Sequence, residues 1–376
     1  MTRSRFLFTL CAAALLFAAV SPGVRAAEEW KDVERVVAIG DIHGDFNQFA
    51  TLLRQAGLID DKEDWSGGRT HLVQTGDVPD RGPDTRRILD LLMKLEKQAR
   101  KQKGYVHALI GNHEAMNIYG DLRYVHPGEY ESFRDRKSEK LREKMYKQHL
   151  DDLARSQPGN GEPTIDEAYK EKWFGERPLG YFEHRLAFAT DGKYGRWIAR
   201  RNVAVKVNDM LFLHGGISPK FVAMPLKDIN RTARAELADF ARLREGMVID
   251  SEGPLWYRGL AERPEAEEEA HVEAVLQSFG VRRVVVGHTY TVTGGAVMPR
   301  FDAKVIIIDI GLSAAYGGRL ACLVIENGKL FALHRGVKLP LPEDQAALLE
   351  YYKQAAALDP QPSPLEAKIK LMAENP

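Results

Sequence analysis

Short apolar runs recur along the chain, and five of them end in glycine followed by polar residues. In chain order they are RVVAIGDIHGD (35–45), THLVQTGDVPDRG (70–82), YVHALIGNHE (105–114), AVKVNDMLFLHGG (204–216) and RRVVVGHTYT (282–291). An apolar run of this length bounded by turn-forming residues is typical of a buried β-strand. The pattern therefore predicts strands whose carboxyl ends carry charged or metal-binding side chains.

Helical patterns separate the first strands, at 46–57, 85–102 and 264–279. Strands that alternate with helices indicate an α/β fold, in which sites form at the carboxyl ends of the strands. Two later runs, AKVIIIDIGLS (303–313) and LACLVIENGKLFALHRG (320–336), predict further strands with a hairpin turn at Asn327–Gly328. We therefore expect a two-sheet β-sandwich flanked by helices, with residues 35–338 as one domain.

Two segments depart from this pattern. Residues 117–198 are charged and mostly helical, and they interrupt the domain between two strand-end motifs. This insertion is a candidate cap beside the site, or a solvated surface excursion. From residue 339 to 376 the chain has helical pieces broken by proline, which predicts a helical C-terminal tail on the surface.

The first 26 residues have the pattern of an export signal. Arg3 and Arg5 precede an apolar run from Phe6 to Val20, and small residues follow up to Ala26. The run is too short to span a bilayer, so we expect a cleaved signal peptide and a bacterial periplasmic location. No later apolar run is long enough to cross a membrane.

Composition and charge narrow the class of protein. The chain has 376 residues, with 44% hydrophobic and 28% charged residues, which is typical of a soluble globular protein. Removal of the signal leaves a net charge of about −3, so a broad nucleic-acid footprint is not expected. Cys322 is then the only cysteine, and its strand-like surroundings predict a packed core residue.

The residues at the strand ends form a set that suits metal ions. They are Asp41, His43, Asp77, Asn112, His214 and His288. Imidazole combined with carboxylate favours borderline cations such as Mn²⁺, Fe²⁺/Fe³⁺ or Zn²⁺. Six ligands match two ions better than one. We expect Asp41, His43 and Asp77 to hold the first ion and Asn112, His214 and His288 to hold the second, with Asp77 as the bridge.

A pair of metal ions indicates phosphoryl chemistry, in which an activated water attacks phosphorus. The leaving oxygen then needs a proton, and His113 is the candidate general acid, with Asp80 as the carboxylate that orients it. Arg81 is a candidate phosphate ligand because its planar guanidinium donates two parallel hydrogen bonds. Arg258, in GPLWYRG, is a second candidate, and Asn112 is expected to contact phosphate as well.

The motifs GDIHG, GDVPDRG, GNHE, HGG and a later GH resemble, in this order, those of the calcineurin-like metallophosphoesterases. Within these the chain resembles the PPP-type phosphoprotein phosphatases, and GPLWYRG with the signal peptide makes it most similar to the bacterial Shewanella-like branch. The resemblance implies an αββα sandwich, the same six metal ligands, the His113–Asp80 pair and phosphate contacts from Arg81 and Arg258.

The sequence also departs from the family pattern. Pro79 stands before DRG, where the family does not usually have proline, and the insertion lengthens the interval from His113 to His214. The tyrosine-bearing loop of the eukaryotic members has no clear counterpart, although Tyr316 in SAAYGG holds a comparable place. These departures leave the preference for Ser/Thr or Tyr phosphate open.

Three functions fit the sequence. The first is a periplasmic phosphomonoesterase that acts on phosphoproteins through two divalent metal ions. The second is the same chemistry on dinucleoside polyphosphates, nucleotides or other small phosphate esters. The third is a metal-binding module without turnover, which the intact His113 and Arg81 disfavour. The pattern does not specify the native metal pair or the oligomeric state.

Overall fold

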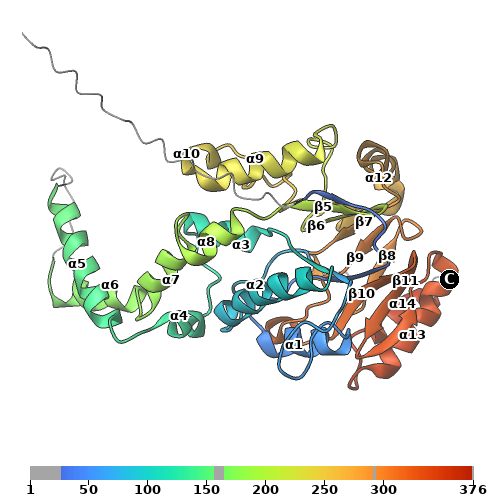
Figure 1. Ribbon diagram of the computed structural model, residues 1–376, viewed down its shortest axis with the longest axis horizontal. Helices are drawn as coiled ribbons and strands as arrows, with labels where there is room; N and C mark the ends of the chain where they lie inside the picture. Colours follow the sequence, from blue (N-terminus) through green and yellow to red (C-terminus); the bar gives the residue numbers. More distant parts are fainter. Residues whose placement is uncertain (1–26, 156–164, 291–293, 375–376) are drawn as a thin grey trace, which may run out of the picture.

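Two six-stranded sheets face one another, with helices on the outside (Figure 1). The computed structural model describes residues 27–155, 165–290 and 294–374, so the predicted export signal lies outside the described residues. Within these ranges, no helix combines the length and the apolar character that a membrane span requires.

The first sheet has the strand order β12-β11-β10-β2-β3-β4. Its strands are β2 (Arg35–Ile39), β3 (His71–Gln74), β4 (Tyr105–Ala108), β10 (Ala321–Glu326), β11 (Lys329–His334) and β12 (Val337–Pro340). The pairs β2–β3 and β3–β4 are parallel, whereas β10, β11 and β12 add an antiparallel extension to β2. The predicted hairpin at Asn327–Gly328 is confirmed, since both residues have positive φ between the paired Glu326 and Lys329.

The second sheet has the order β1-β5-β6-β7-β9-β8. Its strands are β1 (Glu29–Trp30), β5 (Ala204–Val207), β6 (Met210–Leu213), β7 (Arg283–Val286), β8 (Met298–Arg300) and β9 (Val305–Ile307). β6, β7 and β9 run parallel to one another, so their carboxyl ends lie at one edge of the sheet. The predicted two-sheet fold is therefore confirmed.

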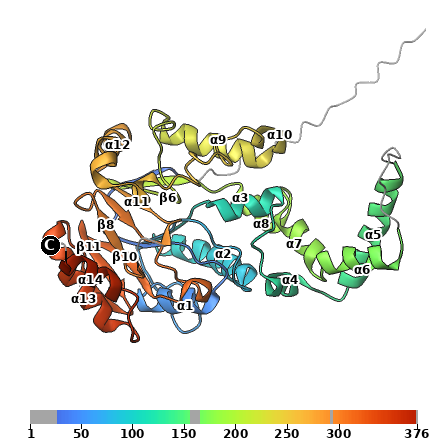
Figure 2. The same cartoon turned by 180° about the vertical axis from the view of Figure 1, so that it is seen from behind.

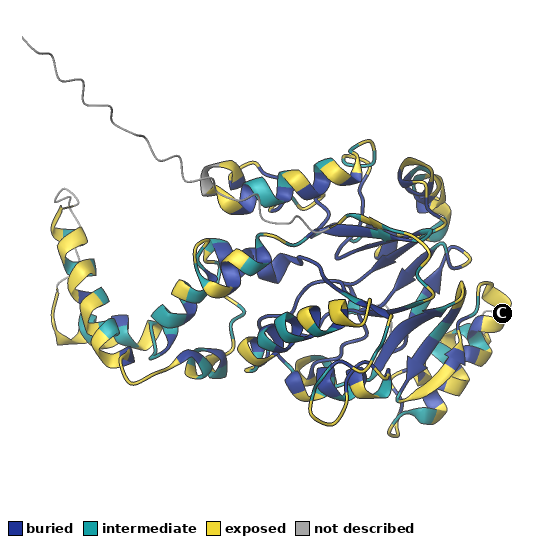
Figure 3. Cartoon of the chain, viewed as in Figure 1, coloured by how far each residue is buried: buried dark blue, intermediate teal, exposed yellow. Residues whose placement is uncertain are grey.

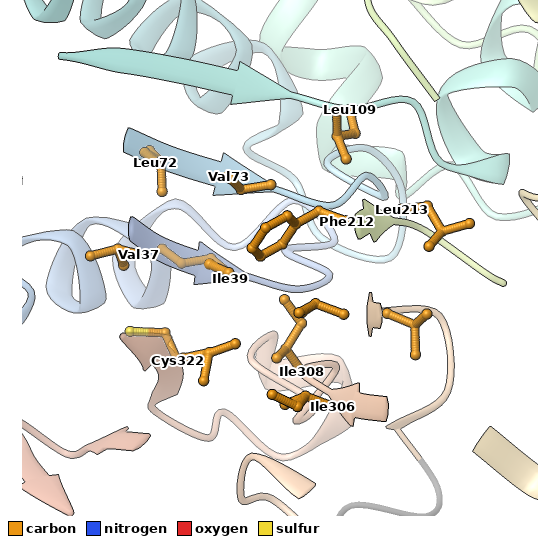
Figure 4. Close-up of a cluster of buried hydrophobic side chains, with 14 of the residues drawn as sticks. Val37, Ile39, Leu72, Val73, Leu109, Phe212, Leu213, Ile306, Ile308 and Cys322 are labelled. Carbon is orange, nitrogen blue, oxygen red and sulfur yellow. The ribbon is translucent and has the colours of Figure 1, made fainter. Parts of the chain in front are cut away.

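Apolar side chains of the two sheets meet in the main core (Figure 4). Ile39 of β2 and Val73 of β3 lie near Phe212 of β6, and all three are buried. Cys322 of β10 is fully buried in the same core, as expected of a packing residue. Because both sheets contribute to this layer, their strand ends are held at fixed relative positions.

Helices cover the outer faces of the sheets. They are α1 (Phe46–Gln55), α2 (Thr85–Lys101), α3 (Asn112–Tyr119), α9 (Leu226–Ala238), α10 (Phe240–Leu243), α11 (Gly259–Glu262), α12 (Glu265–Phe279), α13 (Leu348–Leu358) and α14 (Glu366–Glu374). Helix α2 packs against β4, and α9 packs against β5. Asp45 caps α1 by accepting a hydrogen bond from the Gln48 amide at 3.1 Å, which fixes where the chain leaves the turn after β2.

The insertion projects from the body as a helical arm (Figures 1 and 2). The arm consists of α4 (Pro127–Phe133), α5 (Ser138–Arg155), α6 (Glu167–Glu176), α7 (Tyr181–Phe188) and α8 (Lys193–Ile198). Its outer helix α5 is largely exposed, whereas α4 and α7 pack on each other near the body (Figure 3). Gly180 permits this contact, because a Cβ at that position would lie 1.9 Å from the Tyr130 carbonyl oxygen.

The C-terminal segment packs on the body through α13. Leu348, Tyr351 and Tyr352 are buried, and the Tyr351 hydroxyl donates to the Val297 carbonyl at 2.9 Å. The C-terminal tail was expected to begin at residue 339. That residue lies inside β12, because Leu339 pairs with Ala332 of β11.

Candidate active site

The predicted site residues converge on one cavity of about 300 Å³ at the carboxyl ends of the strands. Asp41 and His43 follow β2, and Asp77 follows β3. The residues that line the cavity are Asp41, His43, Asp77, Arg81, Asn112, His113, Tyr124, Trp256, Arg258, Glu262, His288, Tyr290, Asp309 and Tyr316. Of the predicted residues, His214 and Asp80 lie just behind this lining and contact it.

Several of these residues have a left-handed backbone, which is uncommon outside glycine. Their φ angles are 46° for His43, 58° for Asp77, 73° for Asp80, 66° for Arg81 and 65° for His288. Each such residue costs on the order of 1 kcal/mol or more and persists only where its surroundings fix it. Such strain is concentrated at functional sites, where it aims side chains that a regular strand or helix would turn elsewhere.

One group of ligand atoms gathers around the His214 imidazole. Its Nε2 lies 2.9 Å from Asn112 Oδ1, 3.0 Å from His288 Nδ1 and 3.3 Å from Asp77 Oδ1. Its Nδ1 lies 3.1 Å from the Thr75 carbonyl oxygen, a contact that places the ring proton on Nδ1 and leaves the Nε2 lone pair directed at the group. These atoms are the set expected to hold the second ion.

A second group gathers around the other oxygen of Asp77. His43 Nε2 lies 3.8 Å from Asp77 Oδ2 and 3.9 Å from Asp41 Oδ2, and His113 Nε2 lies 3.7 Å from Asp77 Oδ2. The groups with metal-binding geometry are His43, Asp77 and His113, and Asp77, His214 and His288. Asp77 belongs to both, which places it as the expected bridge, while His113 stands in the first group where Asp41 was expected.

Burial keeps the imidazoles of His43 and His288 unprotonated, so that their nitrogens can bind cations. Burial lowers the pKa of His43 to about 3 and holds the pKa of His288 well below its usual value, so both rings are neutral at neutral pH. Burial would raise the pKa of Asp77, but His214 and His113 hold it well below its usual range. Burial, together with Asp309, raises the pKa of Asp41.

These residues fit two metal ions. Neutral histidine nitrogens and an ionised, shared carboxylate are the donors that borderline cations prefer. Asn112 Oδ1 and His288 Nδ1 lie 2.9 and 3.0 Å from His214 Nε2, and a cation bound among these donor atoms would stabilise their close approach. The site therefore suits a pair of metal ions that share Asp77.

The predicted acid pair is present next to the metal ligands. His113 Nδ1 lies 2.5 Å from Asp80 Oδ2, and Asn117 Nδ2 donates to Asp80 Oδ1 at 3.0 Å. Burial would lower the pKa of His113, but Asp77 and Asp80 raise it above its usual value. With Nδ1 engaged by Asp80, the Nε2 atom is the one that faces the cavity.

Two arginines reach the cavity, as expected. The Arg81 guanidinium lies 3.9 Å above the Tyr124 ring, and its buried Nε has no hydrogen-bond partner among the described residues. Arg258 donates to the His288 carbonyl oxygen and, at 3.1 Å, to Thr289 Oγ1. Arg81 is thus the arginine with unused donors, while Arg258 also ties its loop to the His288 turn.

Aromatic rings form much of the remaining wall. Tyr316 lies 5.1 Å from the His43 ring and 4.5 Å from the Tyr290 ring, centroid to centroid. Trp256 lies 6.1 Å from the His288 ring, and Tyr124 lies 5.2 Å from the His113 ring, centroid to centroid. Tyr316, which was compared with the tyrosine-bearing loop of the eukaryotic enzymes, therefore lies in the wall of the cavity.

Sequence reasoning missed two buried acids. Asp309 follows β9, lines the cavity and hydrogen-bonds with Asp41, and burial raises its pKa to about 6. Glu114 accepts the amides of Asp77, Val78 and Gly111 at 2.9, 2.7 and 2.7 Å. The rule used for the other strand ends, a polar residue directly after an apolar run, would have found Asp309 in VIIIDIG.

The remaining predictions are also located. Pro79, the departure before DRG, accepts a hydrogen bond from His43 Nδ1 at 3.2 Å through its carbonyl, so the proline is compatible with ligand placement. The other seven histidines of the chain do not line the cavity. They are His71, His107, His126, His149, His184, His271 and His334.

Comparison with known proteins agrees with this geometry. A family model described as calcineurin-like phosphoesterase matches residues 34–291. Shewanella-like protein phosphatase 2 of Arabidopsis thaliana is 32% identical over 291 residues, which cover 74% of this chain and 72% of the relative. A symmetrical bis(5'-nucleosyl)-tetraphosphatase of Chromobacterium violaceum is 27% identical over 303 residues, which cover 79% and 94% of the two chains.

A solved structure is similar as well. The cold-active protein-tyrosine phosphatase of a psychrophilic Shewanella species is 29% identical, with a TM-score of 0.64, over 84% of this chain and 83% of that one. The fold, the motif order and the metal-binding groups thus lead to the same family. The chain belongs to the calcineurin-like phosphoesterases, has Shewanella-like protein phosphatases among its homologues, and is a metal-dependent phosphatase.

Proposed function

We propose that this phosphatase hydrolyses phosphate monoesters on phosphoproteins and prefers phosphotyrosine. The observation that carries the preference is the aromatic wall formed by Tyr124, Trp256, Tyr290 and Tyr316 around the metal-binding groups. Aromatic side chains stabilise a bound phenol ring by stacking and edge contacts, and a phosphoserine offers no ring for such contacts. The similar Shewanella structure is that of a protein-tyrosine phosphatase, which supports the same choice.

The reaction follows from the placement of the side chains. Two bound cations, held by the groups that share Asp77, would neutralise phosphate oxygens and activate a water molecule for attack on phosphorus. Arg81 would bind the remaining phosphate oxygens through its free donors. As the ester P–O bond breaks, His113 would give its Nε2 proton to the leaving oxygen, with Asp80 holding the imidazole at Nδ1.

A second candidate is the hydrolysis of dinucleoside polyphosphates. It is favoured by the tetraphosphatase relative, of which the matched region covers 94%. The same aromatic rings would then stack on nucleobases rather than on a phenol ring. The two candidates differ in substrate but not in the residues that handle the phosphate.

A substrate screen separates these candidates. The mature protein is assayed with Mn²⁺ on matched phosphotyrosine and phosphoserine peptides and on diadenosine tetraphosphate. We expect kcat/KM to be highest on the phosphotyrosine peptide and to fall when Tyr316 is replaced by leucine, while Tyr169→Leu on the arm serves as the control. A higher kcat/KM on the tetraphosphate would replace the first candidate by the second.

We also propose that the protein is exported to the bacterial periplasm, on the basis of residues 1–26. N-terminal sequencing of the protein from fractionated cells tests this proposal. A periplasmic product that starts at Ala27 is expected, and an uncleaved chain in the cytoplasm would contradict it.

A further inference from the structure

The helical arm contacts the loop that carries Asp80, the carboxylate paired with the proposed proton donor His113. This loop, residues 79–82, is called the Asp80 loop here. Its Arg81 amide donates to the Tyr124 carbonyl at 3.0 Å, just before the arm begins, and its Gly82 amide donates to the Asp80 carbonyl at 2.7 Å. Two consecutive non-glycine residues, Asp80 and Arg81, have positive φ, so this conformation depends on contacts that hold it.

The deepest of these contacts comes from Glu129 on α4. Its side chain is fully buried and has no arginine or lysine partner. It accepts from the Thr85 hydroxyl at 2.7 Å, three residues after the Asp80 loop, and lies 3.0 Å from His184 Nε2 of α7. The backbone of Asp80 also interacts with the Glu129 carboxyl and lowers its pKa, against the larger effect of burial. Glu129 thereby joins the start of α2, the base of the arm and the Asp80 loop.

We propose that Glu129 is a positioning residue for the proton donor, because it holds the Asp80 loop in its strained conformation and so fixes the direction of the His113 imidazole. This inference rests on the proposed acid role of His113. It gives the arm a part in catalysis although, within the described residues, neither Glu129 nor any other side chain of α4–α8 lines the cavity.

Asn117 in α3 provides a second connection between the arm and Asp80. Asn117 Nδ2 donates to Asp80 Oδ1 and to the His113 carbonyl, both at 3.0 Å. Arg185 of α7 in turn donates to the carbonyls of Asn117 and Ile118. The arm therefore supports both the backbone and the carboxylate of Asp80, from two helices.

The chemistry of Glu129 suggests which substitution preserves its role. Burial raises the pKa of Glu129 to about 8, and burial lowers the pKa of His184 to about 3, so the pair carries no net charge near neutral pH. A glutamine can accept from the Thr85 hydroxyl and donate to the neutral His184 ring. Glu129→Gln should therefore keep the loop in place, whereas Glu129→Leu has the volume but not the hydrogen bonds.

The experiment compares kcat on dinitrophenyl phosphate, whose phenol leaves without a proton, with kcat on phenyl phosphate, whose phenol needs one. General acids typically contribute 10²- to 10⁴-fold, so we expect Glu129→Leu to lose about tenfold or more on phenyl phosphate and less than about twofold on dinitrophenyl phosphate. Glu129→Gln should stay within about twofold of the parent on both substrates, at unchanged metal content. Lys193→Met, which removes an exposed contact between the arm and Asp90, is the control and should change neither rate.

A double-mutant cycle with His113→Asn completes the test. His113→Asn should show the same selective loss, and adding Glu129→Leu to it should cost no more, because the residues act as one unit. Equal losses of Glu129→Leu on both substrates, or additive losses in the cycle, would overturn the inference. If His113→Asn is itself unselective, the acid role fails instead.

Should Glu129→Leu not yield a folded, metal-loaded protein, Thr85→Val decides the matter. It removes one hydroxyl donor to Glu129 at nearly constant volume. The same selective loss on phenyl phosphate, in smaller measure, supports the inference, and its absence overturns it.

Discussion

At the scale of single residues, Arg81 shows how the site prepares to bind an anion. Its guanidinium is held over the Tyr124 ring at 3.9 Å, and no carboxylate neutralises it among the ion pairs of the described residues. A charged, immobilised side chain with unused donors is favourable where a phosphate completes its hydrogen bonds. Stacking also fixes the plane of the guanidinium, which a flexible ammonium group cannot reproduce.

Replacing Arg81 with lysine should therefore reduce activity although the charge is kept. Hydrogen bonds to charged groups contribute about 1.5–3 kcal/mol, so the loss of the fork should lower kcat/KM by roughly ten- to a hundredfold. The control is Arg87→Lys, since Arg87 also stacks on a ring, that of Phe46 at 3.4 Å, but outside the cavity. Steady-state kinetics that give the same values for both variants would contradict a phosphate role for Arg81.

The metal ligands could be predicted from sequence because they lie at the ends of apolar runs. Asp41, Asp77 and His288 stand at such positions, and parallel strands bring their ends together. Glu129 and Tyr124 could not be predicted in this way. They reach the Asp80 loop only through the packing of the insertion, and no local pattern encodes which helix an inserted segment will contact.

At the scale of elements, the turns after the strands matter more than the strands themselves. The turn after β2 packs directly on the Asp80 loop, where a Cβ at Gly44 would lie 2.3 Å from the Gly82 carbonyl oxygen. This approach of two backbones brings His43 and Asp80 into the same site. Glycine is needed here for space as well as for its φ of +65°.

Gly44→Ala and Gly57→Ala form a matched pair that separates these two causes. Gly57 has nearly the same φ, +66°, but a Cβ there would meet nothing within 4 Å. The backbone cost of Gly57→Ala should be about 1 kcal/mol of unfolding free energy, and Gly44→Ala should cost clearly more and lower activity as well. Denaturant unfolding of both variants measures the difference between their unfolding free energies. Equal costs would mean that the turn after β2 and the Asp80 loop can move apart without penalty.

Element boundaries were predicted to within two residues for α1, α2 and α12, because each has a clear apolar periodicity and a turn-forming residue at its end. The direction of the arm could not be foreseen. Helix α5 is charged along most of its length and buries little, and it contacts α6 and α7 of the same arm.

At the scale of the whole molecule, the predicted metal ligands are divided between the two sheets. Asp41, His43, Asp77 and Asn112 follow strands of the first sheet, whereas His214 and His288 follow strands of the second. A cation pair bound by these residues would therefore link the two sheets at their strand ends. Bound metal stabilises only the state in which both sheets are folded and docked.

Chelation should consequently lower the midpoint of thermal unfolding, and Mn²⁺ should restore it in a concentration-dependent way. Elemental analysis of the untreated protein should give close to two ions per chain. His288→Asn is expected to bind less metal and to show a smaller shift, and Arg87→Lys serves as a control with the full shift. An unchanged midpoint after proven removal of the metal would contradict the linkage between the sheets.

The position of β2 has a consequence for biosynthesis. β2 is the strand that precedes Asp41 and His43, and it is flanked by β3 on one side and by β10 on the other. Its second neighbour is encoded nearly three hundred residues later, at 321–326. The edge of β2 therefore stays open until residues 321–326 are available to pair with it, and the metal-binding turn beside it gains its full support only then. Assembly of the site thus requires nearly the whole chain, and a product truncated before β10 would lack it.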